Sequence, residues 1–204
     1  MHDEFDILRE VGSIAAAHGS IALSEILGRK INLLIPSVDI ISCGAVPNKI
    51  NVQEVGIAVI SRILTGMKGE AVFLLDEKNA FKLIGLSCKI REEDKKPDAL
   101  TEMGLSAIKE IGNIVTSAYL SAIGIMLKKV ILTFPPTLIS GTIDEILNII
   151  LSSPRAEDSA IFIEAIFEES HEKMRGGFYL VLGAEAATDI REASKRMLEE
   201  VENK

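Results

Sequence analysis

The fold of this chain is decided by two short stretches that repeat each other, EVGSI at residues 10–14 and EIGNI at residues 110–114. They lie 100 positions apart, and further similar stretches follow both in the same order. These further pairs are GIAVISRIL (56–64) with AIFIEAIFE (160–168), and MKGEAVFLL (67–75) with MRGGFYLVL (174–182). Similarity that recurs in one order predicts an internal duplication, and therefore two halves related by a pseudo-two-fold axis.

The boundary between the halves is predicted from a charged stretch in the middle of the chain. Residues 89–99 read KIREEDKKPDA, and a proline within such a run of charges does not continue a helix or strand. We therefore expect a single domain over residues 1–204, built from repeats at about 1–90 and 98–204. The segment 89–97 would be the linker.

Both halves are predicted to contain the same elements, which make the fold class α+β. Each half opens with a long helix, continues through an extended stretch broken by a proline, forms a strand hairpin and closes with a helix. Consecutive strands between helices indicate an antiparallel-rich sheet with helices packed on it. The expected ranges are 3–28, 30–42, 54–64 with 69–75, and 77–87 in the first half, and 98–128, 129–140, 143–151, 159–168 with 176–183, and 188–201 in the second.

The composition excludes several classes of function. The net charge is −8, 4% of the residues are aromatic, and Lys and Arg do not cluster with them, so we do not expect nucleic acid as a partner. No apolar run reaches about 18 residues and the first residues do not form a signal peptide, so we expect a cytoplasmic protein without membrane insertion. Cys43 and Cys88 fit no metal-binding pattern, and no cofactor is predicted. A duplicated chain contains its own pseudo-symmetry, which favours a monomer.

A stripe of polar residues runs along the long helix of the second half. Ser106, Glu110 and Asn113 fall within about 60° of one another at 100° per residue. A solvated helix face gives the same pattern. Against that interpretation, asparagine is a poor helix former, and the stripe recurs in the first half. Its equivalents there are Asp6, Glu10 and Ser13.

The other side of this helix is expected to pack on the sheet. Ile108, Ile111 and Ile114 are assigned to the apolar face. Gly112 costs about 1 kcal/mol of helix stability relative to alanine, which a close approach to the sheet or to the other half would offset. By similar reasoning, His18 is expected on the inner side of the first helix.

The spacing S-x3-E-x2-N-x22-P, formed by Ser106, Glu110, Asn113 and Pro136, resembles the active-site signature of the CheC/CheX/FliY phosphatases of chemotaxis. The similarity extends over the whole duplicated chain and implies a CheC-like fold. It implies that the protein removes phosphate from the aspartyl phosphate of a CheY-type response regulator. Ser106 and Pro136 would complete the motif.

Roles for the motif residues follow from the same resemblance. Asn113 would position the attacking water, because a carboxamide can hold water without ionising. Glu110 would pair with a lysine of the regulator, and the Mg²⁺ would belong to the regulator. The resemblance also implies the receptor deamidase CheD as a partner. The alternative is a non-catalytic adaptor that binds CheD or the regulator, with a role like that of the switch protein FliM.

The first half departs from the signature. Asp6, Glu10 and Pro36 occupy the matching positions, but Ser13 replaces the asparagine. A serine hydroxyl is shorter than a carboxamide and cannot hold water at the same place. We therefore expect one intact site and one degenerate site, which contributes little activity or serves only for docking.

Overall fold

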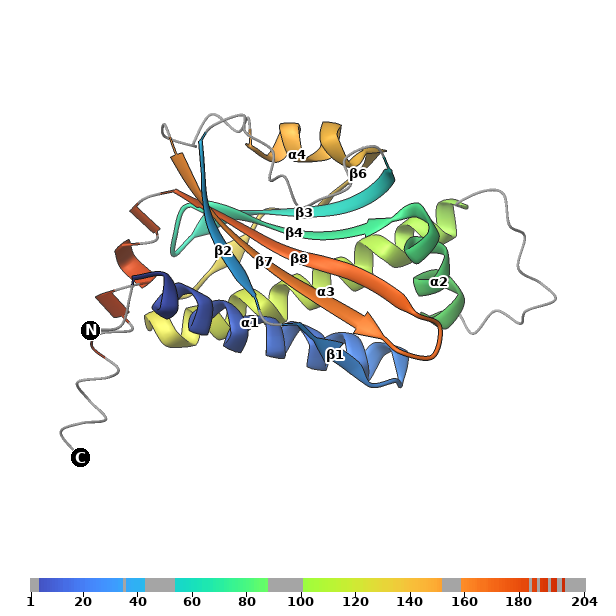
Figure 1. Ribbon diagram of the computed structural model, residues 1–204, viewed down its shortest axis with the longest axis horizontal. Helices are drawn as coiled ribbons and strands as arrows, with labels where there is room; N and C mark the ends of the chain where they lie inside the picture. The colour runs from blue at the N-terminus through green and yellow to red at the C-terminus, as the bar shows by residue number, and fades with distance from the viewer. Residues whose placement is uncertain are drawn as a thin grey trace.

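The computed structural model describes most of the chain as an α+β fold, which confirms the predicted class (Figure 1). It consists of an antiparallel sheet between two layers of helices. The described residues are 4–34, 36–42, 54–87, 101–151, 159–183, 185–186, 188–190, 192–193 and 196. The expected linker 89–97 and most of the closing helix 188–201 lie outside these residues.

The helices cover both faces of the sheet. Helices α1 (Glu4–Leu27) and α3 (Glu102–Leu127) lie side by side on one face. Helix α4 (Ile143–Leu151) covers part of the other face, and α2 (Glu77–Ser87) packs beside α3. The positions of all four agree closely with those expected from the sequence.

The sheet has eight strands in the order β1-β7-β8-β4-β3-β5, with β2 also paired to β7 and β6 also paired to β3. All of these pairs are antiparallel. The strands are β1 (Ile31–Leu33), β2 (Ser37–Ser42), β3 (Val55–Thr65), β4 (Gly69–Asp76), β5 (Leu132–Thr133), β6 (Thr137–Thr142), β7 (Ser159–Glu169) and β8 (Met174–Gly183).

The two halves exchange their outer strands. The hairpins β3–β4 and β7–β8 meet in the centre through the β4–β8 pair. Strands β1 and β2 of the first half then pair with β7 of the second, whereas β5 and β6 pair with β3 of the first. Each half therefore completes the sheet of the other.

Both prolines interrupt an edge of the sheet at equivalent places, as predicted. Pro36 separates β1 from β2, and Pro136 separates β5 from β6. Two residues before Pro36, the N–H of Leu34 donates to the carbonyl of Ile166 on β7 at 2.8 Å. Two residues before Pro136, the N–H of Phe134 donates to the carbonyl of Arg62 on β3 at 2.9 Å. Because proline has no N–H to donate, the chain can change direction here without losing a ladder hydrogen bond.

Two hydrophobic cores lie on opposite faces of the sheet. The larger core, under α1 and α3, contains the rings of Phe73, Phe167 and Phe178, with centroids 4.9 to 5.6 Å apart. The smaller core joins α4 to the outer face of the sheet. Helix α4 begins with a reciprocal cap, in which Thr142 N–H donates to Glu145 and Glu145 N–H donates to the Thr142 hydroxyl. The hydrogen bond that the Thr142 N–H donates to the Glu145 carboxylate lowers the pKa of that carboxyl group.

The larger core contains a tyrosine whose hydroxyl is unpaired. Tyr119 is 2% exposed, and its hydroxyl has no hydrogen-bond partner among the described residues. Burial raises the pKa of Tyr119 well above its ordinary value. An unpaired buried hydroxyl contributes a desolvation penalty. We expect Tyr119→Phe to keep or raise the free energy of unfolding, by up to about 1 kcal/mol, in urea denaturation. A loss of stability would mean that this hydroxyl has a partner in solution.

Candidate functional site

Helix α3 is a long rod with defined ends. It has 26 residues, which corresponds to about 39 Å. At its start the Thr101 hydroxyl accepts from the N–H of Gly104 at 3.1 Å. At its end Lys128 adopts a left-handed conformation with φ of 53°, and its N–H donates to the carbonyl of Ile125 at 3.2 Å. Side chains along this helix are therefore held on a stiff element.

The expected close approach at Gly112 is confirmed. A Cβ atom at this position would lie 2.8 Å from the Cβ of Val59 on β3. In the first half, a Cβ at Gly12 would lie 2.8 Å from the side chain of Ile163 on β7. Each helix thus uses the glycine of its repeated motif to pack against a strand from the opposite half.

The side chains of the motif lie on the accessible side of α3. Ser106 and Glu110 are exposed and Asn113 is half-buried, whereas Ile108 and Ile111 pack into the core. No hydrogen bond or ion pair joins the side chains of Ser106, Glu110 or Asn113 to another described residue. Glu110 and Asn113 are therefore available to a molecule that approaches this face.

Pro136 lies on the part of the sheet that is next to α3. It is half-buried and immediately precedes β6, which contacts α3. The equivalent Pro36 is buried, and its Cβ would be 3.8 Å from a Cβ at Gly12. In the first half, the fold therefore brings the proline of the motif against the motif helix.

The serine of the first half is bonded within its own helix. The Ser13 hydroxyl donates to the carbonyl of Arg9 at 2.9 Å. Arg9 also forms an ion pair with Asp6 at the surface, at 2.9 Å. Glu10 is exposed. The side chains of Asp6 and Ser13 are thus both bonded to Arg9 within α1. Their counterparts Ser106 and Asn113 have no such partner among the described residues.

Two assignments made from the sequence are wrong. Ile114 was placed on the buried face but is 42% exposed, as is the equivalent Ile14. His18 was placed on the inner side of α1 but is exposed. Both EVGSI and EIGNI end in an isoleucine. This repetition was the signal that could have identified an exposed apolar residue next to each site.

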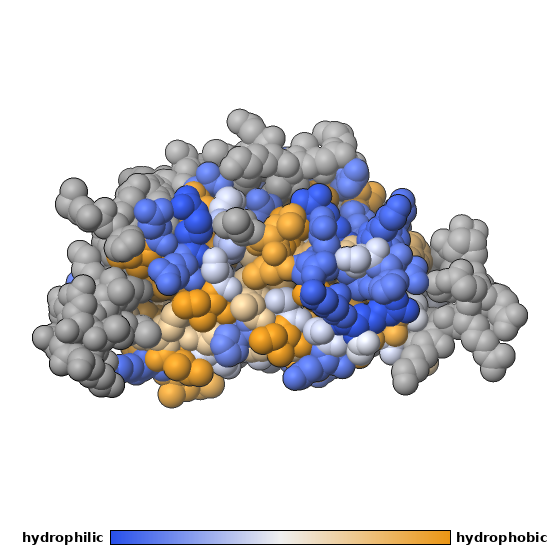
Figure 2. Space-filling model, turned by 60° about the horizontal axis from the view of Figure 1, so that its bottom comes forward, coloured by the Kyte–Doolittle hydropathy of each residue, from blue (hydrophilic) through white to orange (hydrophobic). Residues whose placement is uncertain are grey.

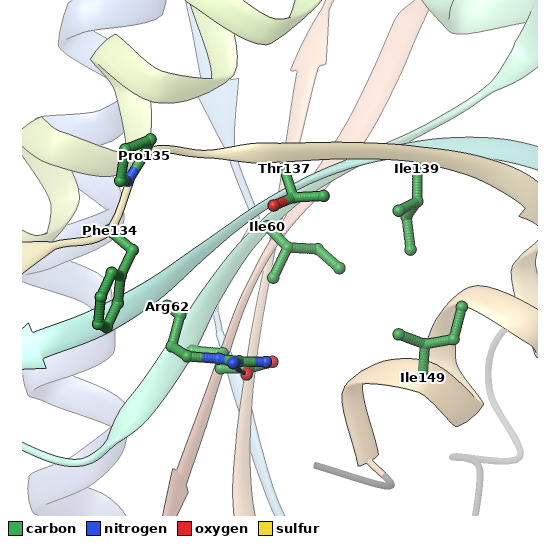
Figure 3. Close-up of a pocket in the computed structure, with 8 residues that line it drawn as sticks. Ile60, Arg62, Phe134, Pro135, Thr137, Ile139 and Ile149 are labelled. Carbon is green, nitrogen blue, oxygen red and sulfur yellow. Dashed lines mark hydrogen bonds and ion pairs between the residues drawn. The ribbon is translucent and has the colours of Figure 1, made fainter.

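The motif lies outside the two hollows described in the structure. One, of about 290 Å³, lies on the α4 side of the sheet, where Arg62 pairs with the buried Glu70 at 2.9 Å (Figure 3). The other, of about 440 Å³, adjoins the end of α1. The first hollow is lined by Ile60, Arg62, Glu70, Phe134, Pro135, Thr137, Ile139 and Ile149. The second is lined by Gly28, Arg29, Lys30, Asn32, Glu169, Ser170 and His171. An exposed helix face suits a macromolecular surface better than a small ligand.

Within the described residues, no group of three or more His, Cys, Asp or Glu side chains is placed to hold a metal ion. Helix α3 is long and apolar enough to cross a membrane by length and composition, but 61% of its most apolar window is buried inside the protein. Figure 2 shows the face formed by α1 and α3 as a mixture of polar and apolar side chains.

The segment that contains the motif is similar to known proteins. Residues 103–140, which contain Ser106, Glu110, Asn113 and Pro136, match the sequence model of the CheC-like family. The chain is 27% identical over 180 residues to the CheY-P phosphatase CheC of Bacillus subtilis, which covers 84% of this chain and 83% of that protein.

Solved structures share the fold. FliY of Thermotoga maritima superposes with a TM-score of 0.74 at 22% identity, covering 96% of this chain and 98% of its own. A chain from the CheX–CheY–BeF3–Mg²⁺ complex of Borrelia burgdorferi gives a TM-score of 0.56 at 17% identity, covering 87% and 99%. The resemblance to the CheC/CheX/FliY family that was drawn from the sequence is therefore confirmed, and its four motif residues lie in the segment that matches the CheC-like family.

Proposed function

We propose that this protein is a phosphatase that hydrolyses the aspartyl phosphate of a CheY-type response regulator. One observation carries the proposal: Glu110 and Asn113 lie one turn apart on the accessible side of a stiff helix, with no partner among the described residues. The similarity to a CheY-P phosphatase supports the choice of substrate.

The chemistry needs little from this chain. Water attacks phosphorus, the bond between phosphorus and the aspartyl oxygen breaks, and inorganic phosphate and a free carboxylate are released. The regulator's own Mg²⁺ and lysine would stabilise the charge on the transferring group. The remaining requirement is a water molecule in line with the bond that breaks. The Asn113 carboxamide is suited to hold that water because it can both donate and accept.

Glu110 would act on the partner rather than on the water. An exposed carboxylate on the same side of α3 can form an ion pair with the regulator's lysine when the two proteins meet. That pair would fix the depth and angle at which Asn113 enters the regulator's site. Helix α3 can supply such positioning because its inner side is held against β3 at Gly112.

The direct test is the lifetime of the phosphoryl group on a CheY-type regulator, measured with and without this protein. We expect the lifetime to shorten in proportion to the amount of protein added. An unchanged lifetime across several such regulators would reject the phosphatase proposal. A binding assay with the regulator and with CheD, which we also propose as a partner, would then identify an adaptor.

The first half offers a gain-of-function test. Ser13→Asn places a carboxamide on a helix that already has Glu10 exposed and Pro36 in place. We expect the rate of dephosphorylation to rise by up to about twofold, as two comparable sites would give, in the same phosphoryl-lifetime assay. Ser24→Asn, also on α1, is the matched control and should leave the rate unchanged. No gain from Ser13→Asn would mean that the Asp6–Arg9 pair or other changes also disable this half.

A further inference from the structure

An exposed isoleucine lies directly beside the candidate site. Ile114 follows Asn113 in the chain and lies one helical turn beyond Glu110 on α3. At 100° per residue, Ile114 lies about 40° from Glu110 on one side, and Asn113 lies about 60° from Glu110 on the other. The rise from Glu110 to Ile114 is about 6 Å. The three side chains therefore occupy one short arc of the helix surface.

The packing of α3 does not account for this isoleucine. Ile108 and Ile111 are buried on the inner side of the helix, whereas 42% of Ile114 stays exposed. A β-branched residue also forms helices less readily than alanine or leucine, so helix propensity does not favour isoleucine at an exposed position. An aliphatic side chain that is exposed in the free protein contributes affinity when a partner buries it.

The duplication links this isoleucine to the neighbouring glutamate. Within the parts of α1 and α3 whose side chains are described, six equivalent positions are exposed in both helices, namely 6, 10, 14, 17, 21 and 25 and the positions 100 residues later. Only two of these positions have the same residue in both halves. They are the glutamate at 10 and 110 and the isoleucine at 14 and 114. The exposed isoleucine is therefore shared by the two halves together with the glutamate of the motif.

We propose that Ile114 is an apolar contact through which α3 docks on the response regulator. This inference rests on the proposed function, which brings the regulator onto Glu110 and Asn113. A specific interface covers about 800 Å² of each partner, an area that extends well beyond the short distance between Glu110 and Ile114. The regulator would therefore bury Ile114 against an apolar part of its own surface, next to its phosphorylated aspartate. Ile114 would supply affinity, whereas Asn113 would act on the water.

The test separates binding of the regulator from its hydrolysis. Ile114→Ala removes most of the aliphatic side chain and replaces isoleucine by a better helix former, so the variant should fold normally. We expect its KM for the phosphorylated CheY-type regulator to rise about 10-fold, as for an interface residue that contributes strongly to binding. Its kcat should stay within about twofold of wild type, because the groups that act on the water are unchanged.

A direct binding measurement accompanies the kinetics. Isothermal titration calorimetry with each CheY-type regulator of the phosphoryl-lifetime assay, loaded with BeF3 and Mg²⁺, gives the affinity without hydrolysis. For Ile114→Ala the affinity should fall by the same factor as KM rises. Ile114→Leu retains an aliphatic side chain of the same volume and should keep the affinity within about threefold of wild type.

Ile149→Ala is the matched control. Ile149 is 58% exposed on α4, which covers the other face of the sheet, so this variant should bind and hydrolyse as wild type does. Wild-type affinity and KM in Ile114→Ala would overturn the inference, as would an equal loss of affinity in Ile149→Ala. A fall in kcat at unchanged KM would also overturn it, because Ile114 would then act on the reacting groups.

The same measurements distinguish this inference from the phosphatase proposal. A wild-type protein that binds the loaded regulator through Ile114 but leaves the phosphoryl lifetime unchanged would support the docking contact and reject the phosphatase. A wild-type protein that shortens the lifetime, with a KM that does not depend on Ile114, would support the phosphatase and reject the docking contact. A wild-type protein that does not bind the loaded regulator would overturn both.

Discussion

Asn113→Ala should lower the acceleration of regulator dephosphorylation by at least about 100-fold, because displacing a positioned reactant has effects of this size. The loss should appear in the rate at saturating regulator, since the carboxamide acts on the water rather than on the docking of the two proteins. Asn113 is half-buried and its side chain has no partner within the described chain, so the variant should fold normally. Single-turnover decay of the phosphorylated regulator measures the rate directly.

Ser117→Ala is the matched control for this prediction. Ser117 lies one turn further along the exposed side of α3 and has no role in the proposed chemistry. The control should retain the wild-type rate. Equal rates for Asn113→Ala and wild type would show that the carboxamide does not position the water, even if the protein proves to be a phosphatase.

Gly112→Val should destabilise the fold by roughly 2–4 kcal/mol, because overpacking and the lower helix propensity of valine act together. A Cβ at this position would lie 2.8 Å from the Cβ and 2.8 Å from a methyl group of Val59. The Cβ of Val59 is fixed to its strand and cannot rotate away, so α3 must move from the sheet. Urea denaturation measures the loss of stability.

The neighbouring helix provides the comparison. A Cβ at Gly19 would meet Val115 at 3.5 Å, an ordinary contact distance. Gly19→Ala should therefore keep or raise the free energy of unfolding, since alanine favours a helix by about 1 kcal/mol over glycine. If Gly112→Val were as stable as Gly19→Ala, the close packing of α3 on β3 would be incorrect.

The elements could be predicted from the sequence because their signals are local. The apolar periodicity of α1 and α3, the prolines at 36 and 136 and the hairpin turns depend on neighbouring residues alone. Because the chain is duplicated, each of these patterns occurs once in each half. The exchange of outer strands between the halves could not be predicted, because equivalent strands have similar patterns and either hairpin would accept them. The strand order depends on contacts between residues that are far apart in the sequence.

The errors at the candidate site have a related cause. Ile114 and His18 were assigned from helical periodicity, which gives the angle of a residue but not the width of the buried face. Helices α1 and α3 pack against the sheet and against each other, so the boundary of burial depends on both neighbours. The role of Ser106, Glu110, Asn113 and Pro136 was inferred from their spacing and a family resemblance, and it stays a prediction.

The crossed pairing of outer strands has an evolutionary consequence. A single ancestral repeat with this topology would have left the open edge of its hairpin unpaired, and a partner polypeptide could have filled it by donating strands. Gene fusion would then have joined two subunits that already depended on each other. After fusion the repeats could diverge separately, so that one could lose its asparagine while the other retained it. In this chain, position 13 is a serine and position 113 an asparagine.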